Sequence, residues 1–87
     1  MNQAEETARA LRVKDKYESD LLAKANVLGV GVGYRHRAGL PTREICLIVM
    51  VRRKVSAADL PPDDRIPAQI DGVPVDVHEI GEVRAKA

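Results

Sequence analysis

The sequence predicts an α+β domain in which one N-terminal helix packs on a three- or four-stranded, mainly antiparallel sheet. Apolar residues recur every three or four positions as far as Ala25, and at every second position from Val27 onward. A second observation is the dipeptide Asp71-Gly72, which is typical of a two-residue turn between antiparallel strands. We therefore expect a single domain over residues 1–81, arranged like a split ferredoxin fold that lacks its first strand.

Length and composition restrict the function. The chain has 87 residues, a formal net charge of +1 and 45% hydrophobic residues, of which only Tyr17 and Tyr34 are aromatic. Such a chain has room for one small aliphatic core, and this argues against most stand-alone enzymes. Because that core offers little burial, we expect part of the apolar surface to meet a partner.

The first element is an amphipathic helix over residues 3–25. Ala10, Val13, Tyr17 and Leu21 are spaced by three or four positions, with charged residues between them, and the segment has neither Gly nor Pro. Asn26 tolerates the left-handed conformation that often follows a helix. We expect the helix to end at Ala25 or Asn26.

A strand follows over residues 27–37, with valines on one side and glycines on the other. The alternation places Gly29, Gly31 and Gly33 on one flat face. Alternating glycines weaken a strand, so we expect a helix or another chain to press closely against them. A phosphate-binding glycine loop is rejected because such a loop turns into a helix, whereas this segment continues as a strand.

The next strand is expected over residues 44–55, after a connection over residues 38–43. It is apolar on both sides, with Cys46, Ile48 and Met50 on the side opposite Leu47 and Val49. A strand of this kind is covered on both faces, one by the helix and the other by a neighbouring subunit or by the segment after Ser56. We favour a subunit, and the expected interface residues are Gly29, Gly31, Gly33, Cys46, Ile48 and Met50.

The remaining chain is expected to form a short crossover, a hairpin arm and a last strand. The spacing of Ser56 and Asp59 indicates a helix start, and Pro61-Pro62 stops that helix after about one turn. The hairpin then joins an arm over residues 66–70 to a strand over residues 73–80. Residues 82–87 are expected to be a flexible tail.

No residue pattern indicates catalysis or a metal. Cys46 lies within an aliphatic run, which suggests a reduced, buried thiol in the cytoplasm. A cluster of Cys46, Asp76 and His78, or a metal site of His36, Asp76 and His78, requires an arrangement that the spacing does not indicate. We expect no enzyme activity, no cofactor and no metal.

Four arginines suggest an alternative function. Arg35, Arg37, Arg52 and Arg53 are candidates for binding a small anionic ligand or nucleotide. The two pairs belong to opposite ends of the predicted hairpin, so nucleic-acid binding is not expected. The longest apolar run, residues 45–51, is too short to span a membrane.

Several segments together resemble a known family. They are residues 21–34 (LLAKANVLGVGVGY), Arg53-Lys54-Val55, residues 60–67 (LPPDDRIP) and residues 70–77 (IDGVPVDV). This combination is similar to the N-terminal region of bacterial trypsin-like-fold proteins of the narrow-leaf type. The resemblance implies a non-catalytic leader domain that precedes a serine-protease-like barrel. The protease residues of the family have no matching positions here.

These observations favour a non-catalytic assembly or accessory domain. We expect it to self-associate as a homo-oligomer or to dock on a protease-like partner, through the glycine-flattened strand and a free sheet edge.

Overall fold

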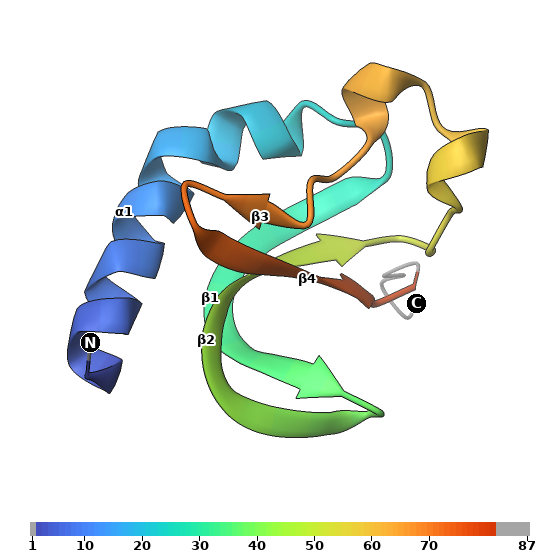
Figure 1. Cartoon of the computed structure of the whole chain (residues 1–87). Helices are drawn as coiled ribbons and strands as arrows, with labels where there is room; N and C mark the ends of the chain where they lie inside the picture. Colours follow the sequence, from blue (N-terminus) through green and yellow to red (C-terminus); the bar gives the residue numbers. More distant parts are fainter. Residues whose placement is uncertain (1, 82–87) are drawn as a thin grey trace, which may run out of the picture.

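The fold is an N-terminal helix packed on a four-stranded mixed sheet, as a computed structural model shows (Figure 1). This confirms the predicted α+β class. The structure describes residues 2–81, apart from the side chain of Ala57, so the predicted tail lies outside the described residues. The elements are α1 (Gln3–Leu22), β1 (Val27–Arg37), β2 (Leu40–Val51), the 3₁₀ turns η1 (Ala57–Asp59) and η2 (Pro62–Asp64), β3 (Gln69–Ile70) and β4 (Val73–Glu79).

The strand order is β1-β2-β4-β3. β1 and β3 pair antiparallel with their neighbours, but β2 and β4 are parallel, with Leu47 beside Val75 and Val51 beside Glu79. The tight turn at Asp71-Gly72 reverses the chain after β3, and this reversal sends β4 in the direction of β2. The sheet is therefore mixed, and β4 lies between β2 and the arm.

Helix α1 begins at a capping residue and ends earlier than predicted. The Asn2 side chain accepts a 2.8 Å hydrogen bond from the Glu5 amide, which is a typical N-cap. The helix ends at Leu22, because the amide of Ala25 is taken by the Asp64 carboxylate at 3.0 Å instead of continuing the helix. Asn26 has the expected positive φ, at 76°, and it starts the turn into β1.

The core lies between α1 and one face of the sheet. The predicted inward face of β2 is confirmed: Leu47, Val49 and Val51 are almost completely buried. They pack with buried residues of α1, β1, β3 and β4, namely Ala10, Val13, Leu21, Val30, Ile70, Val73 and Val75. Burial of these aliphatic side chains is the main stabilising term.

The β1–β2 hairpin is longer and more bent than predicted. Its turn is only Ala38-Gly39, with positive φ at both residues, so β2 starts at Leu40 instead of residue 44. Register shifts after Val27 and after Tyr34 bend the hairpin, and its end curls round below β4 (Figure 1). The face opposite the helix therefore becomes concave.

Candidate interaction surface

The glycine row of β1 is covered by side chains of the adjacent strand. A Cβ atom on Gly29 would lie 3.0 Å from Met50 Cε, and one on Gly33 would lie 2.8 Å from Ile48 Cδ1. On Gly31 the nearest atom would be Met50 Cε at 4.0 Å. Met50 and Ile48 therefore lie across β1 on the concave face. The close approach expected for these glycines exists, but side chains of the same chain provide it.

Cys46 is fully buried within the single chain. Burial raises the pKa of its thiol to about 11. Ile48 and Met50 are half-buried on the same face. Cys46 therefore has no exposed surface in this conformation, and its expected place in an interface stays a prediction.

The curl brings His36, at the end of β1, beside Asp76 and His78 of β4. The backbone amide of His36 donates to Asp76 Oδ2 at 2.8 Å, and His78 Nε2 lies 2.9 Å from the same oxygen. The two imidazole rings are 4.7 Å apart. Burial acts to raise the pKa of Asp76, but the His36 amide and the His78 ring outweigh it, so that pKa lies below its ordinary value. This cluster ties the end of β1 to β4.

The arrangement of this cluster indicates neither a metal site nor a reactive thiol. Within residues 2–81, no three His, Cys, Asp or Glu side chains are arranged to hold a metal ion. The buried Cys46 thiol, with its raised pKa, lacks the activation that a nucleophile requires.

The four arginines considered for anion binding do not converge. Arg35 and Arg37 both face Glu44, at 2.9 and 3.9 Å. Arg52 and Arg53 follow β2 at the opposite end of the β1–β2 pairing. The structure therefore does not assemble these residues into one anion site.

Within residues 2–81, the outer edge of β1 is the longer of the two free edges of the sheet. Within residues 2–81, no strand lies beside that edge. From Val27 to Tyr34 the strand has neither a charged residue nor a proline, although such residues are the usual protection of an edge. At the other edge, β3 has only two residues and follows Pro67. The sheet thus has one short edge and one long, uncharged edge.

Exposed apolar side chains accompany the long edge. Leu28 is 40% exposed and Tyr34 44% exposed, three residues on either side of Gly31. The sequence alternation placed both of them on the inward face with Val30 and Val32. Leu28 lies at a register shift that no signal in the sequence marks, whereas Tyr34 stays on the helix side, where its hydroxyl accepts a hydrogen bond from the Gln3 side chain.

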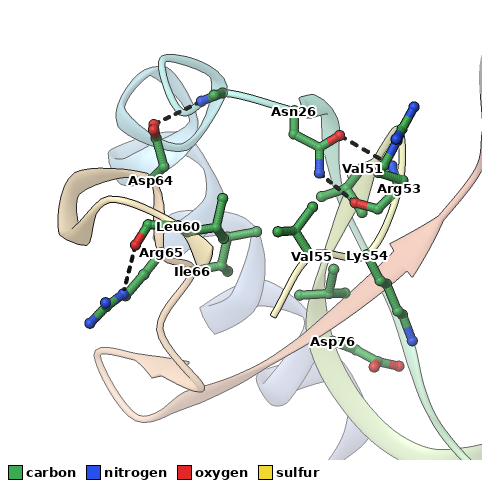
Figure 2. Close-up of a pocket in the computed structure, with 12 residues that line it drawn as sticks. Asn26, Val51, Arg53, Lys54, Val55, Leu60, Asp64, Arg65, Ile66 and Asp76 are labelled. Carbon is green, nitrogen blue, oxygen red and sulfur yellow. Dashed lines mark hydrogen bonds between the residues drawn. The ribbon is translucent and has the colours of Figure 1, made fainter. Parts of the chain in front are cut away.

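A cavity of about 400 Å³ lies at the end of β2 (Figure 2). It is formed where the connection from α1, the crossover after β2 and the strand β4 meet. Its lining includes Leu60, Ile66, Lys54 and Arg65 from the crossover. No pattern in the sequence indicates this cavity, because its lining residues are dispersed along the chain and many of them belong to irregular segments.

The described helix is not of a kind that crosses a membrane, since within residues 2–81 no helix has a sufficiently long apolar stretch.

Comparisons with known proteins identify the family of this chain. No curated protein matches the sequence. A family profile described as the NARROW LEAF 1 N-terminal domain matches residues 3–81, which includes every helix and strand of the structure. The chain therefore belongs to the NARROW LEAF 1 N-terminal domain family.

Proposed function

We propose that this chain is a non-catalytic assembly domain that associates through the outer edge of β1. The observation that carries the proposal is the long, uncharged edge, Val27–Tyr34, which has no neighbouring strand within residues 2–81. An unprotected edge of this kind presents main-chain donors and acceptors to a further strand.

A second copy of the chain is the partner that the edge favours. Two antiparallel β1 strands centred on Gly31 would place the exposed Leu28 near the second copy's Tyr34. Valines would meet valines, and glycines would meet glycines. Arg35 would lie near the second copy's Val27, so like charges would not face each other. The strand is therefore compatible with an isologous, twofold interface.

A protease-like barrel is the alternative partner at the same edge. This alternative rests on the resemblance of the sequence to leader regions of bacterial trypsin-like-fold proteins. A strand of such a partner would use the same main-chain groups, but it would not require the symmetric positions of Leu28 and Tyr34.

Sedimentation equilibrium of the wild type and two variants tests self-association. Leu28→Lys adds a charge beside the edge, whereas Leu40→Lys makes the same change at a residue that is 69% exposed at the hairpin end. We expect wild type and L40K to exceed the 9.5 kDa monomer mass at tens of micromolar, and L28K to remain monomeric. A monomeric wild type, or an equal effect of both variants, would overturn self-association.

A further inference from the structure

The two flanks of helix α1 face opposite edges of the sheet. One flank contacts Asp71, in the turn between β3 and β4, since Arg9 donates to its carbonyl at 2.7 Å and Lys16 lies 3.6 Å from its carboxylate. The other flank is directed toward β1, where the Gln3 side chain donates to the Tyr34 hydroxyl. Because β3 and β1 are the two edge strands, one flank of the helix adjoins each edge.

The flank beside β1 carries exposed leucines and no net charge. In a helix of about 3.6 residues per turn, Leu11 and Leu22 lie on the side away from the Asp71 contacts. Leu11 is 46% exposed and Leu22 is 45% exposed. The charged residues of this flank, Lys14 and Glu18, form an ion pair at 3.0 Å. Two copies of the flank can therefore meet without placing an excess of like charge at their contact.

One of these leucines lies level with the middle of β1. Helix and strand run antiparallel, because the Lys24 carbonyl accepts from the Val27 amide at 3.4 Å and the Gln3 contact lies at the other end of β1. The rise is about 3.3 Å per strand residue and about 1.5 Å per helix residue. These two contacts therefore place Gly31 within about one helical turn of the level of Leu11.

Twofold pairing of β1 would bring the two helices together. The axis between two antiparallel edge strands is perpendicular to the sheet, so both helices would lie on the same face. Helix α1 lies mainly over β1 and β2. Because neighbouring strands are about 4.8 Å apart, the two helices would be about 10 Å apart, which is close to the usual distance between packed helices.

A stable dimer needs more contact area than a strand edge alone provides. Stable interfaces usually bury about 800 Å² on each partner. A strand edge consists largely of main-chain atoms, whereas the helix flank adds apolar side-chain surface directly above it. The flank is therefore the part of the surface that completes an interface of the required size.

We propose that the flank of α1 around Leu11 packs against the same flank of a second copy of the chain. This inference rests on the proposed association through β1, and it adds a helix–helix contact to the strand pairing. The second copy is the occupant that the geometry favours, because an axis near Gly31 places the two Leu11 side chains opposite each other. A protease-like partner at the same edge would not bring two Leu11 side chains together.

Two lysine variants of equally exposed residues test the helix contact. Leu11→Lys places a charge near the axis, whereas Leu22→Lys places the same charge about 16 Å further along α1. We expect the dimer dissociation constant, measured by sedimentation equilibrium, to rise about tenfold for L11K and less than about twofold for L22K. If the wild type dimerises and L28K does not, but L11K behaves like L22K, the helix contact alone is overturned. A monomeric wild type overturns both the helix contact and self-association through β1.

Cross-linking locates the axis independently of affinity. Leu11→Cys and Leu22→Cys are treated with a short bismaleimide, and the wild type, whose Cys46 is buried, is the control. We expect a covalent dimer for L11C and largely monomer for L22C and the wild type on a denaturing gel. A covalent dimer of L22C but not of L11C would contradict the position of the axis and overturn the proposed contact.

Discussion

Ile48 Cδ1 occupies the space beside Gly33 so closely that a Cβ atom there would lie only 2.8 Å away. The equivalent distance at Gly31 is 4.0 Å, to Met50 Cε. Two glycines of the same alternating row therefore have different roles. Gly33 makes room for a neighbouring side chain, whereas Gly31 is not required for packing.

Substitution of these glycines by alanine should have opposite effects. We expect Gly31→Ala to stabilise the fold by about 0.5 kcal/mol, because alanine loses less backbone entropy in a strand. Gly33→Ala should destabilise it slightly, by less than about 1 kcal/mol, because only the flexible Cδ1 end of Ile48 must shift to admit the methyl group. Urea denaturation measures both effects. Ile48→Val removes Cδ1, so the G33A penalty should largely disappear in that background; an unchanged penalty would refute the packing role.

Asn26 joins the start of β1 to the chain after β2. It combines a φ of 76° with two hydrogen bonds to the Arg53 backbone. Asn26→Gly loses the bonds but keeps the backbone freedom, whereas Asn26→Ala loses both. We expect the alanine variant to be less stable than the glycine variant by about 1 kcal/mol in thermal or urea unfolding. Equal stabilities would show that the backbone conformation imposes no cost.

The Asp76 carboxylate should make stability depend on pH in the acid range. Its pKa is lowered in the folded state, so its stabilising effect is present above the ordinary value of about 3.9 and is lost as pH falls through the folded-state pKa. Asp76→Asn should lower stability by about 1 kcal/mol at neutral pH. The difference from wild type should narrow below about pH 4. A difference that stays constant down to pH 2 would contradict the role of the charge.

The Cys46 thiol should be inert in the native protein. It is buried and its pKa is raised to about 11, so the thiolate is scarce at neutral pH. We expect a disulfide reagent such as Ellman's to label Cys46 rapidly in urea and only at the rate of unfolding in native buffer. Rapid labelling of the native chain would indicate an accessible thiol and would reopen the thiol-based hypothesis.

Local patterns in the sequence were sufficient for the helix, the inward face of β2 and the Asp71-Gly72 hairpin. Each of these depends on periodicity or on turn chemistry within a few residues. The curl of the β1–β2 hairpin was not predictable, because it arises from register shifts and from the contact of His36 with Asp76, forty positions later. The burial of Cys46 and the 40% exposure of Leu28 do not follow from the alternation of the strands either, and the interface expected from that alternation stays a prediction.

The parallel pairing of β2 with β4 also could not be predicted from the sequence. The sequence predicts the hairpin of β3 and β4, but not which of the two strands meets β2. In the observed order β4 meets β2, and the crossover between them is anchored to the end of α1 by Asp64 on the Ala25 amide. Asp64 and Ala25 both line the cavity in Figure 2.

Amide hydrogen exchange along β1 at two protein concentrations is the most direct test of assembly through the outer edge of this strand. If a second copy adds its β1 strand, the outward-facing amides between Gly29 and Tyr34 should exchange more slowly at millimolar than at micromolar concentration. Amides of β4 should show no such change, because both neighbouring strands of β4 belong to the same chain. Equal exchange of the β1 amides at both concentrations would contradict assembly through this edge.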